Sequence, residues 1–90
     1  MIDLSKNKKI LNEMLPMLRN FRYGSCCKSL REKQLIKGLS DIFELLEITY
    51  DDSKLKKKPY KYYNALNKII NKDTTLNEKD KIKYTKLMIL

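Results

Sequence analysis

Histidine is absent from this 90-residue sequence, and its two cysteines are adjacent, at Cys26 and Cys27. Without histidine, the chain lacks the commonest general base and the commonest zinc ligand. Adjacent cysteines close a strained ring if they pair, so we expect no structural disulfide, and two thiols alone cannot complete a structural zinc site. We interpret both as reduced, inert thiols of a cytoplasmic protein, in preference to a redox sensor.

Glycine and proline occur only twice each. Their scarcity favours helices and leaves few turn-forming residues for a multi-stranded sheet. No apolar run approaches the roughly 18 to 20 residues of a membrane span. Near the N-terminus, basic residues precede an apolar stretch, but Asn12, Glu13 and Arg19 interrupt it and no small-residue cleavage site follows, so we expect no signal peptide.

Recognisable catalytic and cofactor-binding motifs are also missing. The sequence contains no EF-hand loop, P-loop or dinucleotide fingerprint. Its few carboxylates stand mostly where helix caps or solvent-facing positions are predicted, whereas catalysis needs a positioned base or nucleophile. We therefore expect a protein that binds a partner, with no enzymatic activity, no metal and no cofactor.

Positive charge is what the sequence has in excess, with a formal net charge of +9. Residues 1–50 contribute +3 of this excess, and residues 51–90 contribute +6. Such a surplus promotes solubility and attracts an anionic partner. The charge alone leaves open whether that partner is nucleic acid, anionic lipid or an acidic protein face.

Apolar residues spaced three and four apart predict a first helix over residues 5–22, with Pro16 either kinking it or splitting it. Gly24 follows it and is suited to the left-handed conformation that ends many helices. The apolar face of this helix consists of Ile10, Leu11, Met14, Leu15, Met17, Leu18 and Phe21.

Ser29 and Glu32 form a capping box that opens a second predicted helix, which we expect to end near Ile48. Its buried stripe is Leu35, Ile36, Leu39, Ile42, Phe43 and Leu46. Residues 49–58 break the apolar pattern and are predicted to be a loop.

Pro59 is suited to the first position of a third helix, because its missing N–H would be unpaired there. This helix is predicted to end near Lys72, with a buried side of Pro59, Tyr62, Tyr63, Leu66, Ile69 and Ile70. Thr75 and Glu78 form a second capping box, which opens a fourth helix with Tyr84, Leu87 and Met88 facing inward. Four amphipathic helices predict an all-α single domain over residues 1–90, folded as an antiparallel four-helix bundle.

The lysines of residues 54–61 are candidates for contact with an anionic partner: Lys54, Lys56, Lys57, Lys58 and Lys61. Tyr60 and Tyr62 are close enough in sequence to stack on bases or to lie at a lipid interface. The same run is equally compatible with a solvated loop whose neighbouring tyrosines belong to the core.

Residues 59–90 resemble the second half of the immunity proteins against pediocin-like (class IIa) bacteriocins, of the enterocin A immunity type. The resemblance is carried by Pro59 before the third helix, by the residues that follow along that helix, and by the segment TLNEKDK at residues 75–81. The matching apolar and polar residues are Asn64, Leu66, Ile69, Ile70, Tyr84, Leu87 and Met88.

The resemblance implies an antiparallel four-helix bundle in the cytoplasm of a Gram-positive bacterium, possessing no enzymatic activity. It implies binding to the membrane subunits of the mannose phosphotransferase system once a bacteriocin has engaged them, at the inner face of the membrane. It adds contact residues in the fourth helix and the apolar C-terminus, namely Lys79, Lys83, Lys86, Ile89 and Leu90. We expect a monomer, with an anionic membrane surface as a further partner. The alternative is a small nucleic-acid-binding or regulatory protein of a phage or plasmid.

Overall fold

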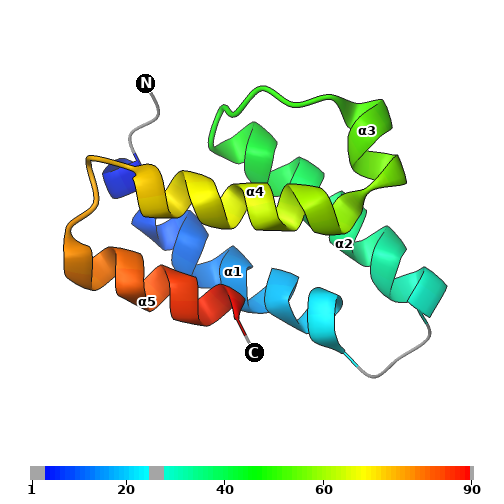
Figure 1. Ribbon diagram of the computed structural model, residues 1–90, viewed down its shortest axis with the longest axis horizontal. Coiled ribbons are helices and arrows are strands. Elements are labelled where there is room, and N and C mark those ends of the chain that lie inside the picture. Colours follow the sequence, from blue (N-terminus) through cyan, green and yellow to red (C-terminus); the bar gives the residue numbers. More distant parts are fainter. Residues whose placement is uncertain (1–3, 25–27, 90) are drawn as a thin grey trace.

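Every regular element of the computed structural model, which describes residues 4–24 and 28–89, is a helix (Figure 1). A 3-10 helix, η1, precedes five α-helices within these residues. Their bounds are Leu4–Asn7 for η1, Lys8–Tyr23 for α1, Lys28–Leu45 for α2, Asp52–Lys57 for α3, Pro59–Lys72 for α4 and Glu78–Met88 for α5. The all-α prediction is confirmed for the described residues. The prediction of a loop over residues 49–58 is wrong, because residues 52–57 form α3.

The helices pack with α1 against α2 and α5, while α4 contacts α2, α3 and α5. In Figure 1, α1 and α5 run from left to right, and α2 and α4 run from right to left. The helices that follow each other directly, α1 with α2 and α4 with α5, are therefore antiparallel. The parallel direction of α2 and α4 arises because the chain after α2 crosses back through residues 46–51 and α3 before α4 begins.

The core receives side chains from η1 and from all five α-helices. It consists of Leu4, Leu11, Leu15, Leu18, Leu35, Leu39, Ile42, Phe43, Leu46, Leu55, Tyr63, Leu66, Ile70, Leu76, Tyr84 and Met88. The Cα radius of gyration is 12.5 Å, close to the value of about 12 Å for a compact folded chain of this length. Most of the predicted stripes thus lie in one core, but Met17 is 36% exposed and does not belong to it.

Helix α1 continues through Pro16, so the chain does not split there. Gly38, in α2, allows α1 and α2 to approach each other closely. A Cβ atom at Gly38 would lie 2.6 Å from Cδ2 of Leu18, and Phe21 is also near. Because α1 and α2 pack at this residue, its missing side chain helps to set their separation.

The residue with a left-handed backbone conformation is Glu47, at the end of α2, and not Gly24. Gly24 has a φ of −64° and an extended ψ of 161°, and it needs to be glycine because a Cβ there would lie 2.6 Å from the carbonyl oxygen of Asn20. Glu47 has a φ of 59°. The helix therefore ends at Leu45, before the predicted Ile48, because the chain turns at Glu47.

Both predicted capping boxes are wrong. Ser29 is the second residue of α2, so it is not its N-cap, and the residue before α2 lies outside the described part of the chain. Helix α5 is capped by Asn77, whose side-chain oxygen accepts a hydrogen bond of 2.8 Å from the N–H of Asp80. Thr75 lies before this cap, and its hydroxyl donates to the carboxylate of Asp73.

Among the described helices, none combines the length and the apolar character needed to cross a membrane.

Candidate functional site

The segment that joins α3 to α4 turns within a single residue, Lys58. Asp51 caps α3 by accepting the N–H of Lys54 at 3.1 Å, and Lys58 N–H donates to the carbonyl of Lys54 at 2.9 Å. The carbonyl of Lys58 then accepts the N–H groups of Lys61 and Tyr62, at 3.2 and 3.4 Å. The two helices are thus held at a fixed junction.

Apolar residues on both sides of this junction direct its lysines outward. Leu55 in α3 and Pro59 at the start of α4 are buried, whereas the neighbouring lysines are exposed. Because residues three and four apart share a helical face, burial of Leu55 places the lysines of α3 on its solvent-facing sides.

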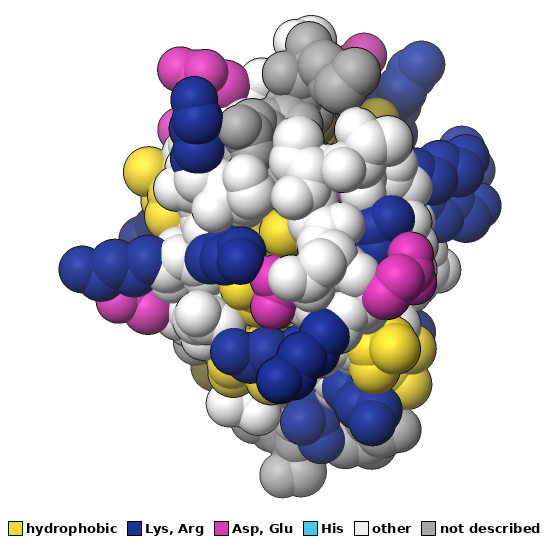
Figure 2. Space-filling model, turned by 90° about the vertical axis from the view of Figure 1, so that its left-hand side faces the viewer, with side chains coloured by type: hydrophobic (Ala, Val, Ile, Leu, Met, Phe, Trp, Pro, Cys, Tyr) yellow, Lys and Arg dark blue, Asp and Glu magenta, His cyan; other side chains and the backbone are white. Residues whose placement is uncertain are grey.

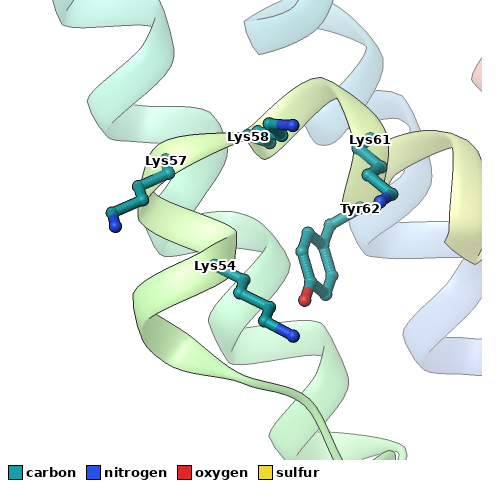
Figure 3. A pocket seen from close by; sticks show the side chains of 5 residues that line it. All are labelled: Lys54, Lys57, Lys58, Lys61 and Tyr62. Atoms are coloured by element: carbon teal, nitrogen blue, oxygen red, sulfur yellow. The ribbon is translucent and has the colours of Figure 1, made fainter.

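A pocket of about 240 Å³ lies at the junction (Figure 3). It is lined by Lys54, Lys57, Lys58, Lys61 and Tyr62, and we call it the lysine pocket. In Figure 3, Lys54 extends toward the hydroxyl end of the Tyr62 ring, Lys61 lies toward the opposite end of the ring, and Lys57 points away from it. Lys54 and Lys57 belong to α3, Lys58 joins the two helices, and Lys61 and Tyr62 come from the first turn of α4.

Among the described residues, none of the ion pairs involves one of the four pocket lysines, so their positive charges have no paired carboxylate. The pairs are Lys8 with Asp80 at 2.7 Å, Lys56 with Asp52 at 3.1 Å, and Lys81 with Glu78 at 3.9 Å. At Lys8, the hydrogen bond to Asp80 raises the pKa of the amino group, an effect of a close carboxylate. The pocket lysines concentrate positive charge without such a carboxylate, so their amino groups attract an anion.

Tyr62 forms the floor of the pocket and is fixed by the core. Its ring centroid lies 6.3 Å from that of Phe43, with the planes at 68°. Phe43 in turn lies 5.4 Å from Tyr50, whose hydroxyl is hydrogen-bonded to Ser40 at 2.6 Å. The ring is half-buried, so it offers the pocket a rigid apolar surface beside the amino groups.

Two residues of the predicted lysine-rich contact surface do not lie at the pocket. Lys56 pairs with Asp52 and does not line the pocket. Tyr60 packs under Arg22, whose guanidinium carbon lies 4.1 Å from the ring centroid, and its hydroxyl donates to Glu32 at 3.5 Å. The structure therefore brings together four of the five predicted lysines with Tyr62 and places Tyr60 on another side of α4.

The predicted contacts in α5 lie apart from the lysine pocket. Lys79, Lys83 and Lys86 belong to α5, which lies on the other side of α4 from α3 in Figure 1. Lys83 lies 5.7 Å from the ring centroid of Tyr84, and Lys86 lines a separate hollow with Lys81 and Ile82. The remaining two predicted contacts are Ile89, which is 51% exposed as expected of an accessible terminus, and Leu90, which lies outside the described residues.

Sequence reasoning missed two arginines near the end of α1. Arg22 stands in the last turn of α1 and lies against the rings of Tyr23 and Tyr60, at 4.9 and 4.1 Å. Arg31 stands in the first turns of α2, with its side chain near Gly24. Their sequence positions gave no sign of this proximity, because long-range packing alone brings α1, α2 and α4 together here.

The opposite end of the molecule has a different charge pattern. Figure 2 shows the end that lies on the left in Figure 1, where acidic side chains stand among the lysines and arginines and small apolar areas lie between them. Asp80 and Glu78, near the start of α5, pair with lysines there. Within the described residues, no group of three or more Cys, Asp or Glu side chains is arranged to hold a metal ion.

Comparison of the chain with models of protein families, with curated proteins and with solved structures finds no match. The lysine pocket and its surroundings are therefore the observations from which a function has to be argued.

Proposed function

We propose that this chain acts by binding, without catalysis, and that it is an immunity protein against pediocin-like bacteriocins. It would bind the bacteriocin-engaged subunits of the mannose transporter from the cytoplasmic side of the membrane and so protect the producing cell. The observation that carries the proposal is the lysine pocket, which four lysines without a paired carboxylate line together with Tyr62.

The resemblance of residues 59–90 to the second half of that family supplies the biological role. The lysine pocket lies where this segment begins, and its residues Lys61 and Tyr62 belong to the helix that follows Pro59. The chain shares the all-helical class of that family, but its α2 and α4 run parallel, unlike consecutive helices of an antiparallel four-helix bundle, and α3 is an additional element.

The geometry favours recognition of a compact acidic group on the partner. Each lysine amino group provides three hydrogen-bond donors, and Tyr62 provides an apolar wall next to them. Because α3 and α4 are joined through Lys58, binding requires little ordering of the junction, which limits the entropic cost of association. A carboxylate cluster or a phosphate on the cytoplasmic side of the receptor complex has the required charge.

The test is survival of a sensitive, transporter-bearing Gram-positive host that expresses the chain and is challenged with a panel of pediocin-like bacteriocins. The wild-type chain is expected to protect against one or a few of them, compared with an empty vector. A variant with Lys54→Glu, Lys58→Glu and Lys61→Glu is expected to lose protection while keeping its helical circular dichroism spectrum.

The matched control carries Lys79→Glu, Lys83→Glu and Lys86→Glu on α5, which changes the net charge by the same amount. Retained protection in this control assigns the effect to the lysine pocket, whereas equal loss in both variants would assign it to overall charge. Killing of cells that contain folded wild-type protein, equal to that of the empty vector across the panel, would refute the immunity role.

Nucleic-acid binding is the second candidate, favoured by the position of Tyr62 between lysines, an arrangement that suits stacking of a base beside its phosphate. The pocket is compact, however, with a volume of about 240 Å³. Titration with duplex and single-stranded DNA at several salt concentrations tests this candidate. A logarithm of the affinity that falls steeply with the logarithm of the salt concentration would support it.

A further inference from the structure

Basic side chains from two parts of the sequence, residues 22–31 and 54–61, lie toward one end of the fold. The lysine pocket lies at the junction of α3 and α4, and the rings of Tyr60 and Tyr23 hold Arg22 beside the start of α4. Arg31 follows in α2, close to the end of α1. In Figure 1, the end of α1 and the starts of α2 and α4 all lie toward the right, together with α3. We call the four pocket lysines with Arg22 and Arg31 the basic end.

The carboxylates nearest to the basic end are already engaged. Asp51 accepts the N–H of Lys54 as the cap of α3, and Asp52 pairs with Lys56. Glu32 accepts the hydroxyl of Tyr60 at 3.5 Å. The four pocket lysines are exposed, whereas Arg22 and Arg31 are half-buried.

Exposed apolar side chains accompany this charge. Tyr23, at the end of α1, is 38% exposed, and Leu30, in the first turn of α2, is 49% exposed. Each is next in sequence to one of the two arginines. Basic residues combined with exposed tyrosine and leucine are typical of surfaces that lie at a membrane interface, where the charges meet lipid phosphates and the apolar groups enter the headgroup region.

We propose that the basic end docks on the surface of a bilayer that contains anionic phospholipid. Lipid phosphates contact the amino groups of the lysine pocket and the arginines, while Tyr23 and Leu30 lie among the headgroups. A polyphosphate chain such as duplex DNA would use the charges but would leave the two apolar side chains without a role. The proposal does not depend on immunity, because a purified protein can bind vesicles whether or not it protects cells.

The expected strength of membrane binding follows from the number of basic side chains at the surface. Each lysine or arginine at an anionic membrane surface contributes about a fivefold gain in partitioning, so three neutralised lysines reduce it by about a hundredfold. Binding also weakens as salt screens the surface, since the Debye length falls from about 30 Å at 0.01 M to about 3 Å at 1 M.

The first experiment is co-sedimentation of the full chain with vesicles of phosphatidylglycerol and phosphatidylcholine, compared with phosphatidylcholine alone. The wild-type chain is expected to bind only the anionic vesicles, and high salt should release it. Lys54→Gln, Lys58→Gln and Lys61→Gln together are expected to reduce binding by about a hundredfold. The matched variant Lys79→Gln, Lys83→Gln and Lys86→Gln removes the same charge from α5 and is expected to reduce binding by only a few-fold.

The second experiment uses the absence of tryptophan from the native chain to report which end contacts lipid. Leu30→Trp introduces a fluorophore at the basic end, and Ile82→Trp introduces one on α5 at a side chain that is 54% exposed. Anionic vesicles are expected to shift the emission of the first variant to shorter wavelength and to leave the second unchanged. Circular dichroism tests whether each variant is folded. If a variant does not fold, the sedimentation of the wild-type chain still tests the proposal.

Three outcomes would overturn the proposal. Absence of wild-type binding to anionic vesicles at low salt removes it directly. Equal loss of binding in the two triple-glutamine variants, or an emission shift at Ile82→Trp alone, shows that diffuse charge or α5 makes the contact. Release of vesicle-bound protein by a modest amount of duplex DNA would identify nucleic acid as the preferred partner.

Discussion

A hydrogen bond from Tyr63 ties the end of α5 to α4. The hydroxyl of Tyr63 in α4 donates to the carbonyl of Met88, the last residue of α5. Tyr63 is buried, and its ring meets that of Tyr23 edge-on, with the centroids 6.4 Å apart. One side chain therefore links three helices and satisfies a carbonyl that a helix end would otherwise leave unpaired.

Replacement of Tyr63 by phenylalanine is expected to lower the free energy of unfolding by about 0.5–1.5 kcal/mol at neutral pH, because the Met88 carbonyl loses its donor. Burial, with a smaller effect of Tyr23, raises the pKa of the Tyr63 hydroxyl above its ordinary value of 10.0. Above pH 10 the unfolded state therefore binds fewer protons than the folded state, and stability falls as pH rises. Urea unfolding between pH 7 and 11 measures both effects.

The Tyr63→Phe variant should lose less stability between pH 9 and 11 than the wild-type chain, because one group with a raised pKa is gone. Tyr84, whose pKa is also raised, chiefly by burial, remains in both proteins and acts as an internal reference. Identical pH profiles for the two proteins would contradict the role assigned to Tyr63.

Asp73 organises the turn between α4 and α5. Its side chain is 8% exposed, and its Oδ1 atom accepts the N–H groups of Thr75 and Leu76, at 2.7 and 3.1 Å, as well as the hydroxyl of Thr75. The Thr75 hydroxyl oxygen also accepts the N–H of Ser5 at 3.2 Å, which links this turn to η1.

Substitution of Asp73 by alanine is expected to lower the free energy of unfolding by about 1–2 kcal/mol, because two backbone donors lose their acceptor. Asp73→Asn keeps one side-chain oxygen in a similar position and should cost less. Thermal unfolding of both variants provides the measurement. An equal loss in the two would show that the carboxylate charge, and not the hydrogen bonds, stabilises the turn.

At the scale of the elements, α2 ends in a Schellman motif built around a residue that does not favour it. Glu47 has its N–H bonded to the carbonyl of Glu44 at 3.1 Å, and Ile48 has its N–H bonded to the carbonyl of Phe43 at 2.8 Å. The left-handed φ of 59° at Glu47 brings Ile48 back onto the core. Glycine adopts this conformation without steric cost, whereas glutamate does not.

Glu47→Gly is expected to raise the free energy of unfolding by about 0.5–1 kcal/mol, since relief of the left-handed strain exceeds the entropy that glycine adds to the unfolded chain. Glu47→Ala is the matched control, because it removes the same carboxylate but retains a Cβ atom. Chemical denaturation of the three proteins separates the two effects. A gain with alanine equal to that with glycine would attribute the change to charge.

Helix α3 is the element that sequence reasoning did not predict. Six residues are too few to form a stable isolated helix, and the lysine-rich composition offers only Leu55 for the core. The structure shows that Asp51 caps its start and that Leu55 is fully buried. Burial of one leucine between α2 and α4 therefore determines that this segment is helical.

Leu55→Ala is expected to cost about 2–5 kcal/mol, the usual range for removing a buried leucine, and to loosen α3. Its consequence for the candidate site is specific, because the pocket requires α3 to hold Lys54 and Lys57 beside α4. Hydrogen exchange at the amide groups of residues 54–58 measures the loosening. Unchanged protection there would show that the junction at Lys58 holds the segment without the core contact.

At the scale of the whole molecule, the charge distribution sets both solubility and stability. The net charge of +9 on a chain this small makes the folded state repel itself, and the lysine pocket concentrates part of that repulsion. The three ion pairs among the described residues involve side chains that are mostly well exposed, so they offset little of it.

Raising the salt concentration from about 0.01 M to about 0.5 M is therefore expected to increase the thermal midpoint, because screening acts more strongly on repulsion than on these few pairs. A rise of about 4–8 °C would correspond to about 1 kcal/mol for a domain of this size. The thermal midpoint of the triple variant Lys54→Gln, Lys58→Gln and Lys61→Gln should rise less. A midpoint that falls with sodium chloride would show that the ion pairs outweigh the repulsion.

The candidate site was predictable in part. The lysine run and Tyr62 were identified, because clustered basic residues and nearby tyrosines are visible without any structure. Lys56 and Tyr60 do not line the pocket with the others, since neighbours in a helix point in different directions. Arg22 was missed because only packing between separate helices brings it against Tyr60, and Arg31 because its proximity to Gly24 depends on how α1 and α2 pack.

Helical periodicity and the scarcity of glycine and proline are local properties, so the sequence alone predicts the helices and their apolar faces. Where the helices end and how they are joined depends on packing between distant residues. Helix α3 exists because Leu55 is buried, α2 stops where Ile48 returns to Phe43, and α2 and α4 run in parallel because the intervening chain crosses back. This packing also gathers the basic end from distant segments, since side chains that share no sequence neighbourhood meet only when a common core holds their helices together.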